Sequence, residues 1–215
     1  MSDLGAKRLE GYGAGLVREI ALAERVKQGL TRLYRLDELP HVGDFVTEAG
    51  ESEREALFVR EAEDDLEIEL RMPKLSAREV DLEGGNLDPL CQIIEGVSHF
   101  VYLAARVSRK RETTQLELEI QAEVDKYVVL AHALPSFSSR TSEKLRERLF
   151  GAVSYCHEEH TTLGERYRLA NDTAQKYTEK LERKYVQNPH VLKMRGELRS
   201  FFEMGLEEKL RAARA

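Results

Sequence analysis

Residues 88 to 132 constrain the fold of this chain more than any other stretch, because a helix here must be covered on more than one side. Charged residues make up 33% of the chain, yet none lies between Glu95 and Arg106. On a helical wheel, one wide face of this stretch is apolar and the opposite face gathers polar side chains. The apolar face holds Leu90, Ile93, Ile94, Val97, Val101 and Ala104, and the polar face holds Glu95, His99, Tyr102 and Arg106. We therefore place this stretch at the centre of the fold.

Two helices are predicted in this central stretch. Asp88 followed by Pro89 is typical of an N-cap and a first-turn proline, and the helix runs to about Arg109. A Thr-x-x-Glu pattern beginning at Thr114 is a capping box, so a second helix starts there. Because only a few residues connect the two helices, they are expected to be antiparallel neighbours. The range 88–133 is thus predicted to be a central helical hairpin.

The N-terminal part of the chain predicts a single helix. Residues 1–13 contain three glycines and no sustained periodicity, which indicates a flexible lead-in. Apolar residues then recur at helical spacing from Leu16 to Leu33, and Pro40 closes the region. This pattern predicts a first amphipathic helix.

Residues 41–86 differ in character and predict an acidic β-hairpin insertion. The region holds 14 acidic and five basic residues, a local balance of −9. Residues 55–62 and 65–73 are both strand-like, and the second segment alternates apolar with charged residues, which is typical of a hairpin with one face in water. An alternative adds a short third strand at 43–50. Since an isolated hairpin is marginally stable, its apolar face is expected to pack on the helices or on a partner.

Residues 140–215 predict the C-terminal helices. An apolar stripe from Leu145 to Cys156 continues at helical spacing. From Leu163 to Leu181 the apolar residues repeat at alternating spacings of four and three, a narrow seam of the coiled-coil type. A last continuous helix is expected after Pro189, and its stripe consists of Leu198, Phe202, Leu206 and Leu210.

Length, charge and cysteine content narrow the functional classes. A chain of 215 residues can bury a substantial core, and 1–215 is expected to form a single domain. The net charge of −6 argues against nucleic acid or an anionic membrane as the main partner. No apolar run approaches the roughly 18 residues that a membrane span requires. Two cysteines, Cys91 and Cys156, are too few for a disulfide-stapled secreted scaffold. The expected location is cytoplasmic.

The first group of candidate metal ligands lies on the two central helices. Glu95 and His99 are one turn apart on the first helix, and Glu119 and Glu123 are one turn apart on the second. Carboxylates and imidazoles on facing helices can bind zinc, iron or manganese. Di-iron bundles, however, carry two Glu-x-x-His pairs, whereas this chain has one Glu-x-x-x-His. The favoured interpretation is structural, with Glu95 paired to Arg106 or His99.

The second group is the run from Cys156 to His160. On the predicted helix Cys156 and His160 share one face at i, i+4, and His157 neighbours His160 at i, i+3. Two ligands do not complete a zinc site, so a further ligand would have to approach from another helix. The competing interpretation is that Cys156 continues the apolar stripe while the histidines lie at a solvated helix end.

These patterns predict a mainly α protein, a bundle of five to seven helices with a small antiparallel β-hairpin inserted after the first helix. No catalytic motif is found, and a non-catalytic interaction or regulatory role without a cofactor is favoured. The hairpin and the 163–181 seam are expected to form contacts with a partner protein or in a homo-oligomer, most simply a dimer. The alternative is a metal-binding helical-bundle protein or metalloenzyme with a carboxylate and histidine site.

Overall fold

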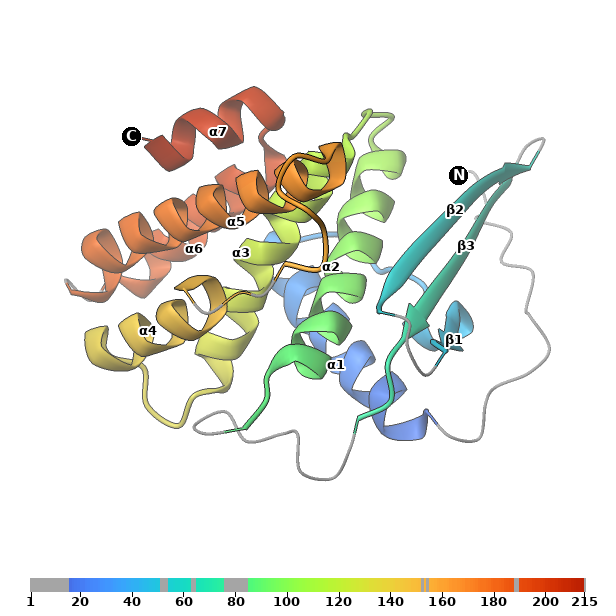
Figure 1. The fold of residues 1–215 in the computed structure, drawn as a ribbon, viewed down its shortest axis with the longest axis horizontal. Helices are drawn as coiled ribbons and strands as arrows, with labels where there is room; N and C mark the ends of the chain where they lie inside the picture. Colours follow the sequence, from blue (N-terminus) through green and yellow to red (C-terminus); the bar gives the residue numbers. More distant parts are fainter. Residues whose placement is uncertain are drawn as a thin grey trace.

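The computed structural model is mainly α-helical, as the sequence predicts. It describes residues 16–50, 54–62, 65–75, 85–151, 153, 155–187 and 190–214, which form seven α-helices and a small sheet. Figure 1 shows the helices gathered into one bundle, with the strands lying to one side of it. Within these ranges no helix is both long and apolar enough to cross a membrane. The predicted lead-in at residues 1–13 lies outside the described residues.

The predicted central hairpin is confirmed and consists of α2 (Asp88–Ser108) and α3 (Gln115–Ala133). The Thr114 hydroxyl accepts a hydrogen bond from the Glu117 N–H at 3.2 Å, and the Thr114 N–H donates to Glu117 Oε2 at 2.9 Å. This is the capping box that the sequence indicates, and it satisfies two backbone donors at the start of α3. Both helices are buried on more than one side because other elements cover them.

The remaining helices surround this hairpin. The first helix, α1 (Val17–Tyr34), packs on α2 and also contacts α6 (Val191–Glu203). Helices α4 (Ser139–Arg146) and α5 (Thr162–Leu181) pack on α3, and α7 (Leu206–Arg214) packs on α5. One cluster of buried apolar side chains joins all of these helices.

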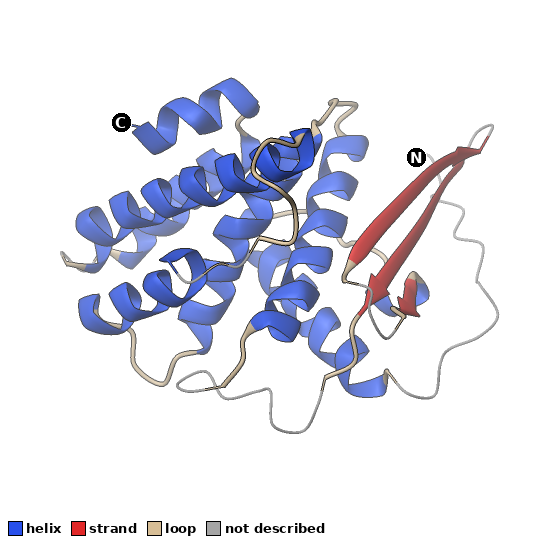
Figure 2. Ribbon diagram, in the orientation of Figure 1, coloured by secondary structure: helices blue, strands red, loops and turns tan. Residues whose placement is uncertain are grey.

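The sheet confirms the predicted hairpin and adds the short third strand. Strands β2 (Ala56–Ala62) and β3 (Asp65–Met72) are antiparallel, and β1 (Val46–Glu48) pairs in parallel with β3, so that the strand order is β1-β3-β2. The side chains of Leu70 and Met72 are fully buried, and β3 contacts α2. Figure 2 shows the strands lying beside the helices. The hairpin therefore gains its stability from α2, as expected for a sheet too small to stand alone.

The predicted helical stripe from Leu145 to Cys156 is wrong beyond Phe150. Helix α4 ends at Arg146, a π-helical turn follows at Glu147–Gly151, and the described residues from 153 to 160 are not helical. The Asn171 side chain donates to the Phe150 carbonyl at 3.3 Å, so a group on α5 takes the place of a helical N–H. The break cannot be read from the apolar spacing because its partner lies on a distant helix.

The predicted last helix is also wrong as a continuous element, because the chain turns between α6 and α7. The Arg106 guanidinium donates to the Met204 carbonyl at 2.7 Å, and the Lys209 ammonium donates to the Phe201 carbonyl at 2.8 Å. The Gly205 N–H donates to Glu208 Oε2 at 3.1 Å and so caps the new helix. These side chains satisfy the backbone groups that the interruption leaves without helical partners.

The coiled-coil-like seam of α5 is filled within the chain. Helix α5 contacts both α3 and α7, and its central seam residues Ala170, Ala174, Tyr177 and Leu181 are almost fully buried. These four residues are therefore unavailable to a second copy, and the homo-oligomer stays a prediction without their support.

A buried polar network joins four helices on one side of the central hairpin. The Asp125 carboxylate accepts hydrogen bonds from the Tyr34 hydroxyl, from Ser98 Oγ at 2.6 Å and from Gln121 Nε2 at 3.1 Å. The Lys209 ammonium donates to Gln121 Oε1 at 2.6 Å. Burial raises the pKa of Asp125 to about 6 and lowers the pKa of Lys209 to about 7. The network thus connects α7 to the core through groups that are costly to bury when charged.

Val101→Asp is expected to abolish cooperative folding, because Val101 is only 1% exposed and an unpaired buried carboxylate costs several kcal/mol. The matched control is Val107→Asp on the same helix, where the side chain is 41% exposed; the expected cost there is below about 1 kcal/mol. Urea unfolding followed by circular dichroism measures both. Equal stability of the two variants would contradict the central position of α2.

Lys209→Met tests whether burial of the Lys209 amine makes the stability of the protein depend on pH. Between pH 7 and 9.5 the unfolded parent keeps the Lys209 proton while the folded parent loses it, since the folded pKa is about 7. The unfolded state binds more protons, so the unfolding free energy of the parent rises relative to the variant by at most about 1.4 kcal/mol per pH unit. Unfolding curves of both proteins at pH 7 and pH 9.5 measure this change, and a constant difference between them would contradict it.

Candidate functional site

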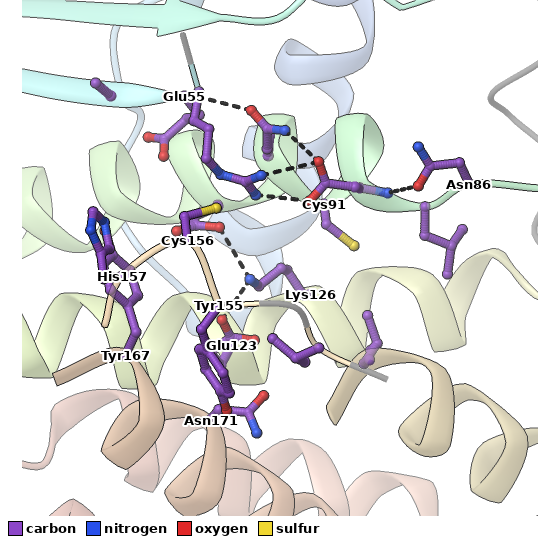
Figure 3. Close-up of a pocket in the computed structure, with 18 of the residues that line it drawn as sticks. Glu55, Asn86, Cys91, Glu123, Lys126, Tyr155, Cys156, His157, Tyr167 and Asn171 are labelled. Atoms are coloured by element: carbon purple, nitrogen blue, oxygen red, sulfur yellow. Dashed lines mark hydrogen bonds and ion pairs between the residues drawn. The ribbon is translucent and has the colours of Figure 1, made fainter. Parts of the chain in front are cut away.

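The structure brings three of the predicted ligands together between α2 and α3. One ligand atom from each of Glu95, His99 and Glu119 lies within 4.8 Å of the other two. His99 Nε2 is 3.6 Å from Glu119 Oε2. The fourth predicted residue, Glu123, is displaced toward Lys126, whose ammonium lies 2.6 Å from Glu123 Oε1 and 3.1 Å from Glu95 Oε2 (Figure 3). The partner of Glu95 is therefore Lys126 and not Arg106, which pairs with Glu117.

The sheet adds a carboxylate that sequence reasoning missed. Glu55, just before β2, places Oε1 at 3.6 Å from His99 Nδ1, and its side chain is buried. A Cβ atom on Gly96 would lie 2.9 Å from Glu55 Oε1 and 2.7 Å from Leu70 Cδ1, so the sheet approaches α2 this closely only because residue 96 is glycine. A glycine within a strong helical pattern is the one local signal of such a contact.

Charge within this cluster does not balance unless it holds protons or a cation. Four carboxylates face two fixed cations, which leaves a charge of −2 before His99 is counted. The carboxylates belong to Glu55, Glu95, Glu119 and Glu123, and the cations belong to Lys126 and to Arg166, whose Nη2 is 3.7 Å from Glu119 Oε1. Because like charges repel strongly where water is excluded, an added positive charge stabilises this arrangement.

The pKa directions agree with this imbalance. Burial raises the pKa of Glu55 and of Glu123. Burial alone would lower the pKa of His99, yet the nearby carboxylates of Glu119 and Glu55 raise it well above its ordinary value. Burial would likewise raise the pKa of Glu95, but the Lys126 and His99 charges more than offset it and the pKa is lowered. The cluster therefore favours the protonated form of His99.

Two buried atoms of the cluster lack hydrogen-bond partners. Within the described residues, neither His99 Nε2 nor Glu55 Oε1 has a partner at hydrogen-bond distance. Their nearest charged neighbours lie 3.6 Å away, which is too long for a hydrogen bond. Leaving a buried imidazole nitrogen without a hydrogen bond costs free energy. The side chains of the cluster therefore lie close together, but two of their buried polar atoms still lack hydrogen bonds.

A cavity of about 850 Å³ opens above the cluster. Figure 3 shows it between the sheet, the two central helices and α5, with Lys126 and Glu123 in its lining. Glu95 also lines the cavity, whereas His99 and Glu119 do not. Its size falls in the range of small-molecule sites.

The second predicted group of ligands is not part of the three-residue cluster. The run from Cys156 to His160 is non-helical, so the predicted helical pairing of these residues is wrong. His157 lines the cavity and stacks on Tyr167 with ring centroids 5.5 Å apart, while His160 is exposed. A Cβ atom on Gly164 would lie 1.9 Å from the Glu158 carbonyl oxygen, which shows how closely this loop lies on α5.

Comparison of the chain with protein-family models, with curated proteins and with solved structures found no match to any of them.

Gly96→Ala is expected to separate the sheet from α2, because the new Cβ atom would overlap Leu70 and Glu55. The expected loss of stability is about 1 to 3 kcal/mol. Gly29→Ala on α1 is the matched control, since nothing lies within 4 Å of the added Cβ; there alanine is expected to stabilise the helix by up to about 1 kcal/mol. Thermal unfolding measures both, and a gain in stability for Gly96→Ala would contradict the close contact.

Proposed function

We propose that this protein binds a divalent cation, zinc, iron(II) or manganese, through Glu95, His99 and Glu119. The observation that carries the proposal is the convergence of these three ligand atoms within 4.8 Å. Ligands about 2.0 to 2.2 Å from a common ion are separated by no more than about 4.4 Å, so small side-chain rotations complete the site. The sequence offers this metal-binding protein as the alternative to an interaction role, and the convergence of the three ligand atoms favours it.

Glu55 supports the proposal from the opposite side of the imidazole. Its Oε1 faces His99 Nδ1 at 3.6 Å. A carboxylate in this position favours a proton on Nδ1 and leaves the Nε2 lone pair free for a cation, the arrangement common around histidine ligands. Binding of a cation at Nε2 would give this buried nitrogen the partner that it lacks among the described residues.

Charge gives an independent reason for a divalent ion. The carboxylates of the cluster exceed the Lys126 and Arg166 charges by two, and a divalent cation neutralises this excess. Three protein ligands leave at least one coordination position open, as in catalytic rather than structural zinc sites. Because Glu95 also lines the cavity, an open position can face that space.

An interaction or regulatory role stays a second proposal. One observation favours it: β2 lies at the edge of the sheet and carries the exposed side chains Phe58 and Val59. Such an edge can pair with another chain.

Titration of metal-stripped protein with zinc and with manganese tests the cation site. Binding of about one equivalent is expected, with a rise in melting temperature that a chelator reverses, because the ion binds only the folded state. Glu119→Gln and His99→Ala are expected to weaken binding at least tenfold. Isothermal titration calorimetry measures the affinity, and circular dichroism confirms that each variant is folded.

His157→Ala and His160→Ala are the matched controls, because neither residue belongs to the cluster. They are expected to bind the cation as the parent does. Undiminished binding by folded His99→Ala and Glu119→Gln, or no binding by the parent, would refute the proposed function.

A further inference from the structure

Lys126 has an unused donor at the floor of the cavity. Its residue is more than nine-tenths buried, and an ammonium group has three N–H donors. Two of them serve Glu95 at 3.1 Å and Glu123 at 2.6 Å. No third hydrogen-bond partner is found among the described residues, although Lys126 lines the cavity. The third donor is therefore available to a molecule in that space.

The proposed cation site and Lys126 share one residue, Glu95. The carboxylate of Glu95 is part of the three-residue cluster, pairs with Lys126 and lines the cavity. A cation bound there would draw the charge of Glu95 away from the ammonium. The divalent ion would balance the charge of the cluster, and its open coordination position would lie beside the third Lys126 donor, an arrangement that suits an oxygen group able to bind both.

The cavity is much larger than a single anionic group requires, and part of its wall is apolar. A ligand that fills about 850 Å³ must also place a body against this wall. The apolar and aromatic lining includes Phe58, Leu87, Leu149, Val153, Tyr155 and Tyr167. Some of these side chains are only partly covered, and Val153 is 38% exposed, so a ligand body would remove apolar surface from water.

We propose that the cavity binds an organic acid, whose carboxylate coordinates the cation beside Glu95 and accepts a hydrogen bond from Lys126, and whose apolar body lies against Val153 and Tyr155. This inference rests on the proposed cation site and names the class of ligand that the site takes. The carboxylate supplies both negative charge and oxygen donors, and the body supplies buried apolar area.

Cobalt(II) is the probe, because its visible absorption reports a change of its ligands. Parent protein loaded with cobalt is titrated with benzoate, acetate and inorganic phosphate. Benzoate is expected to change the spectrum and to bind at least tenfold more tightly than acetate, since only benzoate has a body for the apolar wall. Lys126→Met is expected to weaken benzoate binding at least tenfold.

Val153→Trp tests the apolar wall without touching the cation ligands. It is expected to weaken benzoate binding at least fivefold while cobalt binding is kept. Leu169→Trp is the matched control: Leu169 is also 38% exposed, and it does not line the cavity. This variant is expected to bind benzoate as the parent does. The tryptophan pair keeps the test valid if Lys126→Met fails to fold.

The outcomes separate this inference from the proposed function. Cobalt binding with no spectral response to benzoate would refute the organic acid and leave the cation site standing. Phosphate binding more tightly than benzoate would refute an organic acid in favour of a phosphate-type anion. Equal benzoate affinity of Val153→Trp and the parent would refute the apolar wall, and a parent that binds no cobalt would refute the cation site itself.

Discussion

The pairing of ionisable side chains on both faces of the α2–α3 hairpin is the constraint on which the rest of the fold depends. One face carries Asp125, which needs the hydroxyls of Tyr34 and Ser98 and lies beside the Lys209 network. The other face carries the carboxylate and histidine cluster, which needs Lys126 and groups from α5 and the sheet. Because neither face can be left uncompensated in a dry interior, helices must cover one side, and the sheet with α5 must cover the other.

Local signals in the sequence were sufficient for the central elements. Apolar spacing located α1, α2, α3 and α5, and the capping box at Thr114 marked the start of α3 to the residue. The strict alternation of apolar and charged residues located β3. For the site, helical geometry alone put Glu95 with His99 on one face, and the antiparallel hairpin then brought Glu119 to them. These features depend on residues at most a few turns apart, which is where sequence patterns are most informative.

Features that depend on contacts between residues far apart in the chain could not be predicted from local sequence patterns. Glu55 belongs to the cluster only because the sheet docks at Gly96, about 40 residues further along the chain. The turn at Gly205 exists because Arg106 and Lys209 bind the carbonyls that it exposes. The loss of helix after Phe150 likewise involves Asn171. In each case a helical pattern continues through the site, and a tertiary hydrogen bond or close contact outweighs the local preference.

The proximity of Glu55 to His99 would couple two equilibria: the opening of the sheet, and the binding of a ligand to the cluster. Glu55 directly precedes β2, and His99 lies on α2. Transient opening of the sheet would remove one of the two carboxylates facing the imidazole and expose the cluster to water. By reciprocity, whatever occupies the cluster and favours Glu55 in place must also suppress that opening. If the proposed cation site is occupied, amide exchange along β2 and β3 would report its occupancy, although its ligands lie on the helices.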